Sequence, residues 1–180
     1  MKIVILGCGR VGATLAMMMA RDPREANDVI IIDQNSDAFE RLAQDFKTKI
    51  KTVIGDGIDE DVLRRAGLEG ADAFVSVTNG DNRNIMAAQI AKHIFRVPKV
   101  ICRIYDPSRQ ETYKQLGLDS ISPTVVGAKL LRDALLERSS QTSSANHAIA
   151  YGASVPVVPL GDAPSSERGR ERGASPSKGR

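Results

Sequence analysis

The sequence predicts an α/β fold in which a doubly wound parallel sheet of about six strands carries helices on both faces. Three observations predict it. Strand-like and helix-like patterns alternate from the first residue, as they do when helices connect parallel strands. The strand segments are short and apolar, as strands buried on both faces are. A glycine-rich turn joins the first strand to the first helix, which places the sheet in the Rossmann-like class.

Six segments carry the strand pattern. The second of them reads VIIID and ends on an acid. The predicted strands are Lys2–Leu6, Val29–Asp33, Thr52–Ile54, Ala73–Thr78, Val100–Tyr105 and Leu118–Ile121.

Helical patterns follow each strand. Asp22 and Pro23 end the first helix. Ser36 is a candidate cap for the second, whose apolar face would hold Phe39, Leu42, Ala43 and Phe46. The predicted helices are Val11–Arg21, Ser36–Phe46, Asp59–Ala66, Asn82–Phe95, Ser108–Leu116 and Val125–Glu137.

The periodicity ends after Glu137, so we expect a domain over residues 1–137 and a linker with a mostly disordered tail over 138–180. Residues 167–180 hold five basic and two acidic side chains, which equals the whole formal charge of +3. The folded part is therefore neutral. Because there is also no Trp and only 4% aromatic residues, we expect no nucleic-acid partner.

Two cysteines, Cys8 and Cys102, form neither a disulfide framework nor a zinc spacing, and we interpret them as small buried residues. The first residues already read as a strand, which is not the pattern of a secretory leader. No apolar run approaches the roughly 18 residues of a membrane span. A cytoplasmic protein is expected.

The glycine turn, Gly7-x-Gly9-x-x-Gly12, predicts a dinucleotide site. The first glycine would make the tight turn, the second would let a pyrophosphate approach the backbone, and the third would let helix and strand pack closely. The helix N-terminus offers free N–H groups to the phosphates. Asp33 would accept the ribose hydroxyls and repel a 2′-phosphate, which favours NAD(H) over NADP(H). The alternative is that the glycines only shape a turn in a ligand-free sheet.

Further candidates stand where other predicted strands end, because open α/β sheets bind ligands at that edge. Asp56 and Gly57 follow the third strand, and Thr78 and Asn79 follow the fourth. Thr78 and Asn79 could instead cap the next helix. Arg103 interrupts the apolar fifth strand, which favours a partner such as a phosphate or a carboxylate at an interface.

The sequence carries no arrangement typical of catalysis. There are two histidines, no Ser/His/Asp set with a supporting turn, and no substrate domain after the nucleotide fold. Tyr113 and Lys114 are adjacent, so they lack the four-residue spacing that aligns a proton relay on one helix face. A binding protein is therefore favoured over the alternative, a small NAD-dependent oxidoreductase or sugar-nucleotide-modifying enzyme. A scaffold that no longer binds nucleotide is a third reading, which the intact glycines and Asp33 disfavour.

Several segments together resemble one family, the TrkA-N or RCK N-terminal domains that regulate bacterial potassium uptake systems and some potassium channels. The resemblance covers about residues 1–137 and is carried by GCGRVG (7–12), IIDQN (31–35), GDGID (55–59), ADAFVSVTNGDNRNIMAAQIAK (71–92), ICRIYDP (101–107) and SISPTVVGAKLL (120–131).

This resemblance implies a dimer, often assembled into an octameric ring under a membrane potassium transporter, that binds NAD(H) or, alternatively, ATP or ADP. It implies that Arg10, beside Val11 in the glycine turn, lies near the phosphates and that Asp33 takes the ribose. Asp56 and Gly57 would flank the adenine, Thr78 and Asn79 would lie near the second half of the nucleotide, and Arg103 would face the ligand or the dimer cleft. The final helix would be the crossover helix that packs on a partner subunit.

Two features depart from the family pattern. Its members commonly continue into a C-terminal ligand-sensing domain, whereas here the chain becomes rich in serine after Glu137; either that domain is absent or the chain is truncated. Members also often carry Ala where this chain has Gly57.

Overall fold

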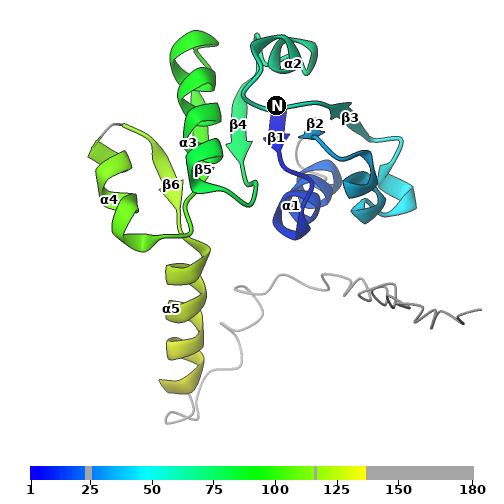
Figure 1. The fold of residues 1–180 in the computed structure, drawn as a ribbon. Helices are drawn as coiled ribbons and strands as arrows, with labels where there is room; N and C mark the ends of the chain where they lie inside the picture. The colour runs from blue at the N-terminus through cyan, green and yellow to red at the C-terminus, as the bar shows by residue number, and fades with distance from the viewer. Residues whose placement is uncertain (23–25, 116, 137–180) are drawn as a thin grey trace, which may run out of the picture. The chain divides into compact units, whose positions relative to one another are not determined.

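A computed structural model describes residues 1–22, 26–115 and 117–136 of the chain. These residues form a six-stranded sheet in the order β3-β2-β1-β4-β5-β6, with every pair parallel (Figure 1). This confirms the Rossmann-like sheet, and the strand order reverses between β1 and β4. The strands are β1 (Lys2–Leu6), β2 (Asp28–Asp33), β3 (Ile50–Ile54), β4 (Ala73–Ser76), β5 (Lys99–Arg103) and β6 (Asp119–Ile121).

The predicted strand positions are confirmed within one or two residues. The largest shortening concerns the strand expected over Ala73–Thr78, because β4 ends at Ser76 and Thr78 turns into the next loop. The helices are α1 (Arg10–Arg21), α2 (Glu60–Arg65), α3 (Asp81–Gln89), α4 (Pro107–Gln115) and α5 (Pro123–Leu136).

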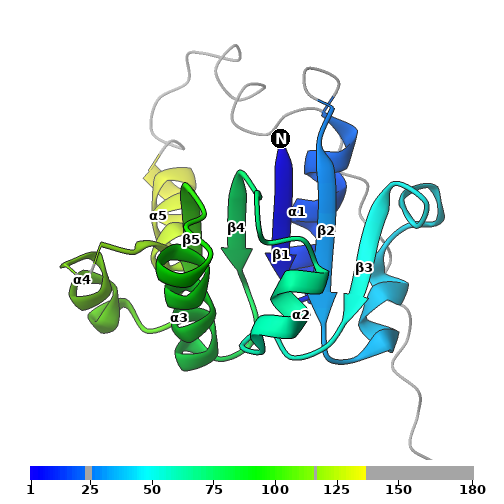
Figure 2. The same ribbon diagram turned by 90° about the horizontal axis from the view of Figure 1, so that it is seen from above.

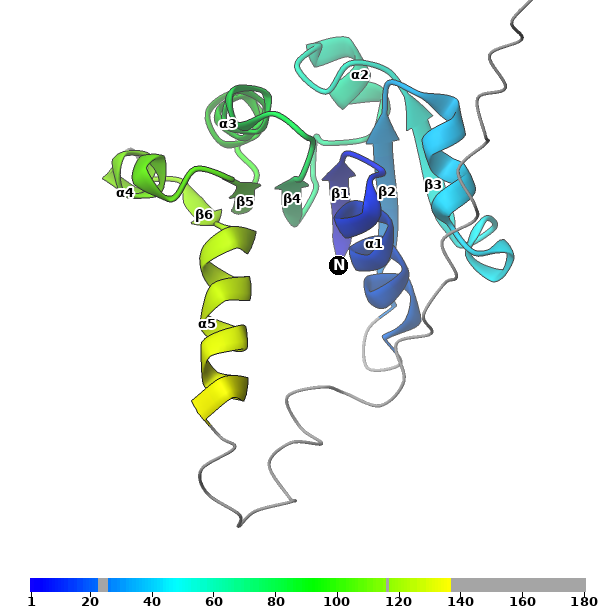
Figure 3. The same cartoon turned by 60° about the horizontal axis from the view of Figure 1, so that its bottom comes forward.

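Helices α1 and α3 cover opposite faces of the sheet (Figures 2 and 3), and an apolar core lies under each of them. On one face, Ala13 and Ala16 of α1 pack with Ile3 and Ile5 of β1. On the other, α2 and α3 cover the alternate side chains of the same strands, with Phe74 fully buried. Because successive side chains of a strand point to opposite faces, the two cores are separate, and α1 and α3 begin on different sides of the sheet.

The single helix expected over Ser36–Phe46 is wrong. The chain forms two short 3-10 turns, η1 (Ser36–Arg41) and η2 (Gln44–Phe46), separated by extended backbone at Leu42. Leu42 and Phe46 are both buried, four residues apart as on one helix face, but the extended backbone at Leu42 and Ala43 interrupts the helix and leaves Ala43 exposed. The cap is Asn35, whose side chain accepts the N–H of Asp37, and not Ser36.

The helix expected over Asn82–Phe95 begins one residue earlier and changes character before its end. After α3 the chain widens into a π-helical turn, η3 (Ile90–Ile94). No α-helix among the described residues is both long and apolar enough to cross a membrane. The predicted linker and tail over 138–180 lie outside the described residues.

The last helix, α5, begins at Pro123, two residues before the predicted start. None of its described residues is buried within the chain, although it carries five leucine and valine side chains that are at least 46% exposed. Figures 1 and 3 show it extending from the end of β6.

Candidate functional site

A cavity of about 770 Å³ lies at the carboxyl ends of β1, β2 and β4, where the strand order reverses. Open α/β sheets bind their ligands at this position. Ten of the eleven predicted site residues line it; Gly12 does not. The lining residues from the prediction are Gly7, Gly9, Arg10, Val11, Asp33, Asp56, Gly57, Thr78, Asn79 and Arg103.

A different structural reason accounts for glycine at each of the three positions of the turn. Gly7 has a φ of 103°, and a Cβ there would lie 3.0 Å from the backbone nitrogen of Thr78. Gly12 packs behind the cavity, where a Cβ would overlap the carbonyl oxygen of Gly7. Gly9 has an ordinary φ of −75°, and a Cβ there would meet nothing within 4 Å. The fold therefore needs Gly7 and Gly12, whereas only something that enters the cavity would need Gly9.

The N-terminus of α1 opens into the same cavity. Gly9 is its N-cap and has no side chain to satisfy the first N–H groups, and the first turn carries no acidic residue. Free N–H groups and the positive end of the helix dipole favour an anion there.

Asp33 stands at the end of β2 and holds the glycine turn. Its Oδ2 accepts the backbone N–H of Cys8 at 2.7 Å, and its Oδ1 accepts that of Asn35 at 3.0 Å. Each carboxylate oxygen can accept a second hydrogen bond. Asp33 can thus serve both as a support of the turn and as an acceptor for a ligand.

Cys8 and Cys102 are both fully buried, as predicted. Burial, followed by the nearby Asp33 carboxylate, raises the pKa of the Cys8 thiol to about 11, against a smaller lowering by Arg41. Burial is also the main cause that raises the pKa of Cys102 to about 11. Both are neutral thiols near pH 7, which is the state of a core residue and not of a nucleophile.

Asp56 and Gly57, which follow β3, also line the cavity. The Asp56 carboxylate accepts the N–H of Ile58 at 3.2 Å, which closes a local turn. Gly57 is buried against Leu6, and a Cβ at Gly57 would overlap the Leu6 side chain.

Thr78 is positioned by a residue that the sequence analysis missed, Asn84. The Asn84 Oδ1 accepts both the backbone N–H and the hydroxyl of Thr78, each at 2.8 Å. Its Nδ2 donates to the carbonyl oxygens of Thr78 at 3.1 Å and Arg103 at 3.0 Å. Asn84 is fully buried, with both oxygen lone pairs and both amide hydrogens engaged. One sequence feature could have identified Asn84: it has helical spacing with Ala87, Ala88 and Ala91, which places its amide on the buried face of the helix.

The alternative reading of Thr78 and Asn79 as caps of the next helix is wrong. Gly80 is the N-cap of α3 and makes no side-chain cap bond. The Thr78 hydroxyl bonds Asn84 in the first helical turn, and the exposed Asn79 lines the cavity.

Arg103 is buried and incompletely satisfied. One terminal nitrogen donates to the carbonyl oxygen of Thr78, and the guanidinium lies over the Tyr105 ring at 4.2 Å from its centroid. Its Nε is buried without a hydrogen-bond partner. Since a buried guanidinium N–H without a partner is costly, an acceptor supplied at the cavity would stabilise it.

Four arginines line the cavity against two carboxylates. The two that the sequence analysis missed are Arg41, at the end of η1, and Arg83, in the first turn of α3. Among the described residues, none of the four has a carboxylate within ion-pair distance, whereas five other basic residues of the chain do. The four are Arg10, Arg41, Arg83 and Arg103.

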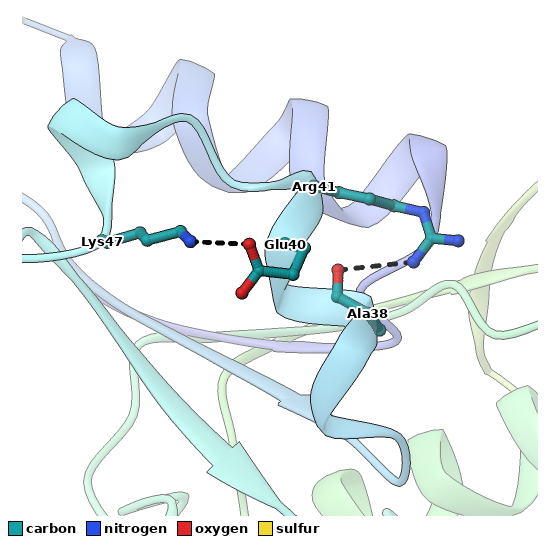
Figure 4. Close-up of polar contacts among 4 residues, drawn as sticks. All are labelled: Ala38, Glu40, Arg41 and Lys47. Carbon is teal, nitrogen blue, oxygen red and sulfur yellow. Dashed lines mark hydrogen bonds and ion pairs between the residues drawn. The ribbon is translucent and has the colours of Figure 1, made fainter. Parts of the chain in front are cut away.

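The neighbours of Arg41 explain why its charge has no carboxylate partner among the described residues. The neighbouring Glu40 carboxylate pairs with Lys47 at 2.9 Å, and the Arg41 guanidinium extends in the opposite direction and reaches only the carbonyl of Ala38 at 3.4 Å (Figure 4). Because guanidinium groups without a carboxylate partner bind phosphate and carboxylate strongly, the arginines of this cavity could hold an anion with more than one charge.

Comparison with known proteins agrees with this geometry. Residues 3–123 match the TrkA-N domain family. A relative from Streptomyces coelicolor, the Trk system potassium uptake protein TrkA, is 44% identical over 138 residues, which cover 77% of this chain and 58% of the relative. The chain thus spans a little over half the length of that relative.

Two solved structures share the fold at similar sequence identity and TM-score. The GsuK channel bound to NAD is 25% identical, with a TM-score of 0.62, covering 77% of this chain and 24% of that one. GsuK bound to ADP is 26% identical, with a TM-score of 0.60, covering 77% of this chain and 34% of that one.

Proposed function

Because the chain belongs to the TrkA-N domain family, we propose that it is a nucleotide-binding regulatory subunit, not an enzyme, that controls potassium transport through a membrane transporter or channel. One observation carries the nucleotide part: four arginines that have no carboxylate partner within the described part of the chain line one cavity together with the N-terminus of α1 and Gly9. A dinucleotide or nucleoside diphosphate has the charge and the length to use all of them.

NAD(H) is the proposed ligand, with ADP or ATP as the alternative. The cavity residues suit the parts of NAD(H) in order along the sheet edge. Asp33 would accept the ribose hydroxyls, with Asp56 and Gly57 beside the adenine; the turn from Gly7 to Gly12, with Arg10 and Val11, would hold the diphosphate. Thr78, Asn79 and Arg103 would bind the second half of the ligand. That GsuK structures hold NAD and ADP supports both ligands.

The proposed mechanism is a shift between two arrangements of an assembly. A ligand moves such an equilibrium only by its difference in affinity for the two arrangements. The exposed leucines of α5 supply an apolar surface on which a second copy of the chain would pack, so that two nucleotide sites lie in one dimer. Four such dimers would form an octameric ring.

The partner would be the membrane subunit of a potassium transporter, which would hold this chain at the cytoplasmic face of the membrane. The support is the naming of the 44% identical relative as a Trk potassium uptake protein. Residues 1–137 would form the nucleotide-binding domain, and residues 138–180 a linker and a mostly disordered tail.

A thermal-shift panel of NADH, NAD, NADPH, ADP and ATP tests the nucleotide claim. A ligand at about one hundred times its dissociation constant adds about 2.7 kcal/mol to the free energy of unfolding, which is a clear rise in Tm. An unchanged Tm with every nucleotide would contradict the proposal. Steady oxidation of NADH that depends on a small carbonyl compound would favour an oxidoreductase instead.

A further inference from the structure

The Arg83 side chain lines the cavity and reaches a residue that follows another strand. It is partly buried and comes from the first turn of α3, and its Nη1 donates to Oε1 of Gln34 at 3.2 Å. Gln34 directly follows β2, next to Asp33. Both side chains line the cavity, so this hydrogen bond joins two of its walls that are 49 residues apart in the chain.

Arg83 comes from a helix on the face of the sheet opposite to α1. The helix α1, which begins at the glycine turn, packs in one core of the sheet, while α3 packs in the other. A ligand at the sheet edge would therefore have the N–H groups of α1 on one side and the Arg83 side chain on the other.

The present partner of Arg83 is a weak one. Gln34 Oε1 is a neutral acceptor, and a single hydrogen bond at 3.2 Å uses one of the five guanidinium N–H groups. Arg83 has no carboxylate within ion-pair distance among the described residues. A phosphate group offers two charged oxygens that can accept a pair of parallel hydrogen bonds from the guanidinium, which is the stronger interaction.

We propose that Arg83 exchanges Gln34 for the diphosphate of the bound nucleotide, and that this exchange makes the site select nucleotides with two or more phosphates over nucleosides. The proposal rests on the proposed nucleotide-binding function and adds a specificity-determining pair to it. The free N–H groups of α1 serve the diphosphate from one side, and Arg83 neutralises it from the other. The hydrogen bond to Gln34 holds the arginine in place in the meantime.

The test measures the affinities of the full chain for ADP, NADH and adenosine by isothermal titration calorimetry. Arg83→Gln is expected to weaken ADP and NADH about tenfold, while the affinity for adenosine changes less than about twofold. Arg83→Lys keeps the positive charge but lacks the planar guanidinium that donates two parallel hydrogen bonds, so it should recover part of the lost affinity. Gln34→Ala removes the competing acceptor and should leave ADP binding equal or tighter.

Arg65→Gln is the matched control, because Arg65 is an exposed cation of the neighbouring helix α2 that does not line the cavity. It should leave all three affinities unchanged, and the Tm without ligand should be the same for every variant. If Arg83→Gln weakens the binding of ADP and adenosine equally, the ratio of the two affinities is unchanged. Arg83 would then only shape the site, and the proposal would be overturned. If the unaltered chain binds none of the three ligands, the proposed function itself fails.

Discussion

The Oδ1 atom of Asn84 lies 2.8 Å from the backbone nitrogen of Thr78 and at the same distance from its hydroxyl. The first residues of α3 are thereby tied to the loop after β4, and through the Arg103 carbonyl to the end of β5. One buried amide thus sets the positions of two cavity-lining residues, Thr78 in the loop after β4 and Arg103 at the end of β5.

Replacement of Asn84 by Ala should lower the free energy of unfolding by roughly 2–4 kcal/mol, because several buried donors and acceptors lose their partner at once. Urea denaturation measures this. Asn82→Ala is the control, since Asn82 is two residues earlier in the same helix and its side chain makes only an exposed hydrogen bond, from Arg109 at 2.7 Å, so the change should cost about 1 kcal/mol or less. Equal effects of the two substitutions would contradict the role given to the amide.

Gly9 and Gly12 should respond in opposite ways to an added methyl group. Gly9→Ala should leave the Tm of the ligand-free chain unchanged, because its Cβ meets nothing within 4 Å, yet the rise in Tm with NADH should be reduced. Gly9→Leu should abolish that rise. Gly12→Ala should lower the ligand-free Tm, because its Cβ would overlap the Gly7 carbonyl. A Gly9→Leu chain that NADH still stabilises would show that the ligand does not approach this backbone.

Asp33→Ala should change both stability and selectivity. The N–H groups of Cys8 and Asn35 lose their acceptor, which should cost about 1–2 kcal/mol. Loss of the negative charge should weaken the binding of NADH and lower the ratio of NADH affinity to NADPH affinity, as measured by titration of both. If the NADH-to-NADPH preference stays the same while stability falls, Asp33 supports the turn without reading the ribose.

The leucines of α5 should hold the assembly together. Leu131 is 69% and Leu135 is 73% exposed within the single chain, so Leu131→Asp or Leu135→Asp removes no internal packing. Each substitution is expected to convert a dimer or larger assembly into monomers that still bind nucleotide. Sedimentation velocity at tens of micromolar gives the answer, and a monomer in the unaltered chain would exclude this interface.

The buried thiols predict a loss of stability at alkaline pH. The pKa of Cys8 and of Cys102 is about 11 in the folded chain, above the value of about 8.5 for a free thiol. Below about pH 8.5 both states hold the proton and the contribution is fully present; between there and pH 11 only the unfolded chain ionises, so stability falls. Urea denaturation from pH 7 to 10.5 should show a shallower fall in a chain with both cysteines changed to Ala. An identical slope would contradict the raised pKa values.

The sequence by itself determined the strands, the order of elements and most of the candidate site. Each central strand is apolar along its length, which is the pattern of strands buried between two layers of helices, and the alternation with helical segments favours that arrangement. The glycine spacing and Asp33 were readable because the reasons for Gly7 and Gly12 are local contacts around a single strand-turn-helix unit.

The tertiary structure alone decided the rest. Two 3-10 turns replace the expected helix after β2, although Leu42 and Phe46 keep the four-residue spacing of a helix, because the backbone between the turns is extended at Leu42 and Ala43. Arg41, Arg83 and Asn84 join the cavity region from segments that the sequence leaves far apart, and their roles depend on which carboxylates and carbonyls lie within reach. Helical spacing could place Asn84 on a buried face, but only the packing of α3 against β4 and β5 shows which groups it bonds. Such contacts are set by side chains converging in space, and no pattern along the chain records them.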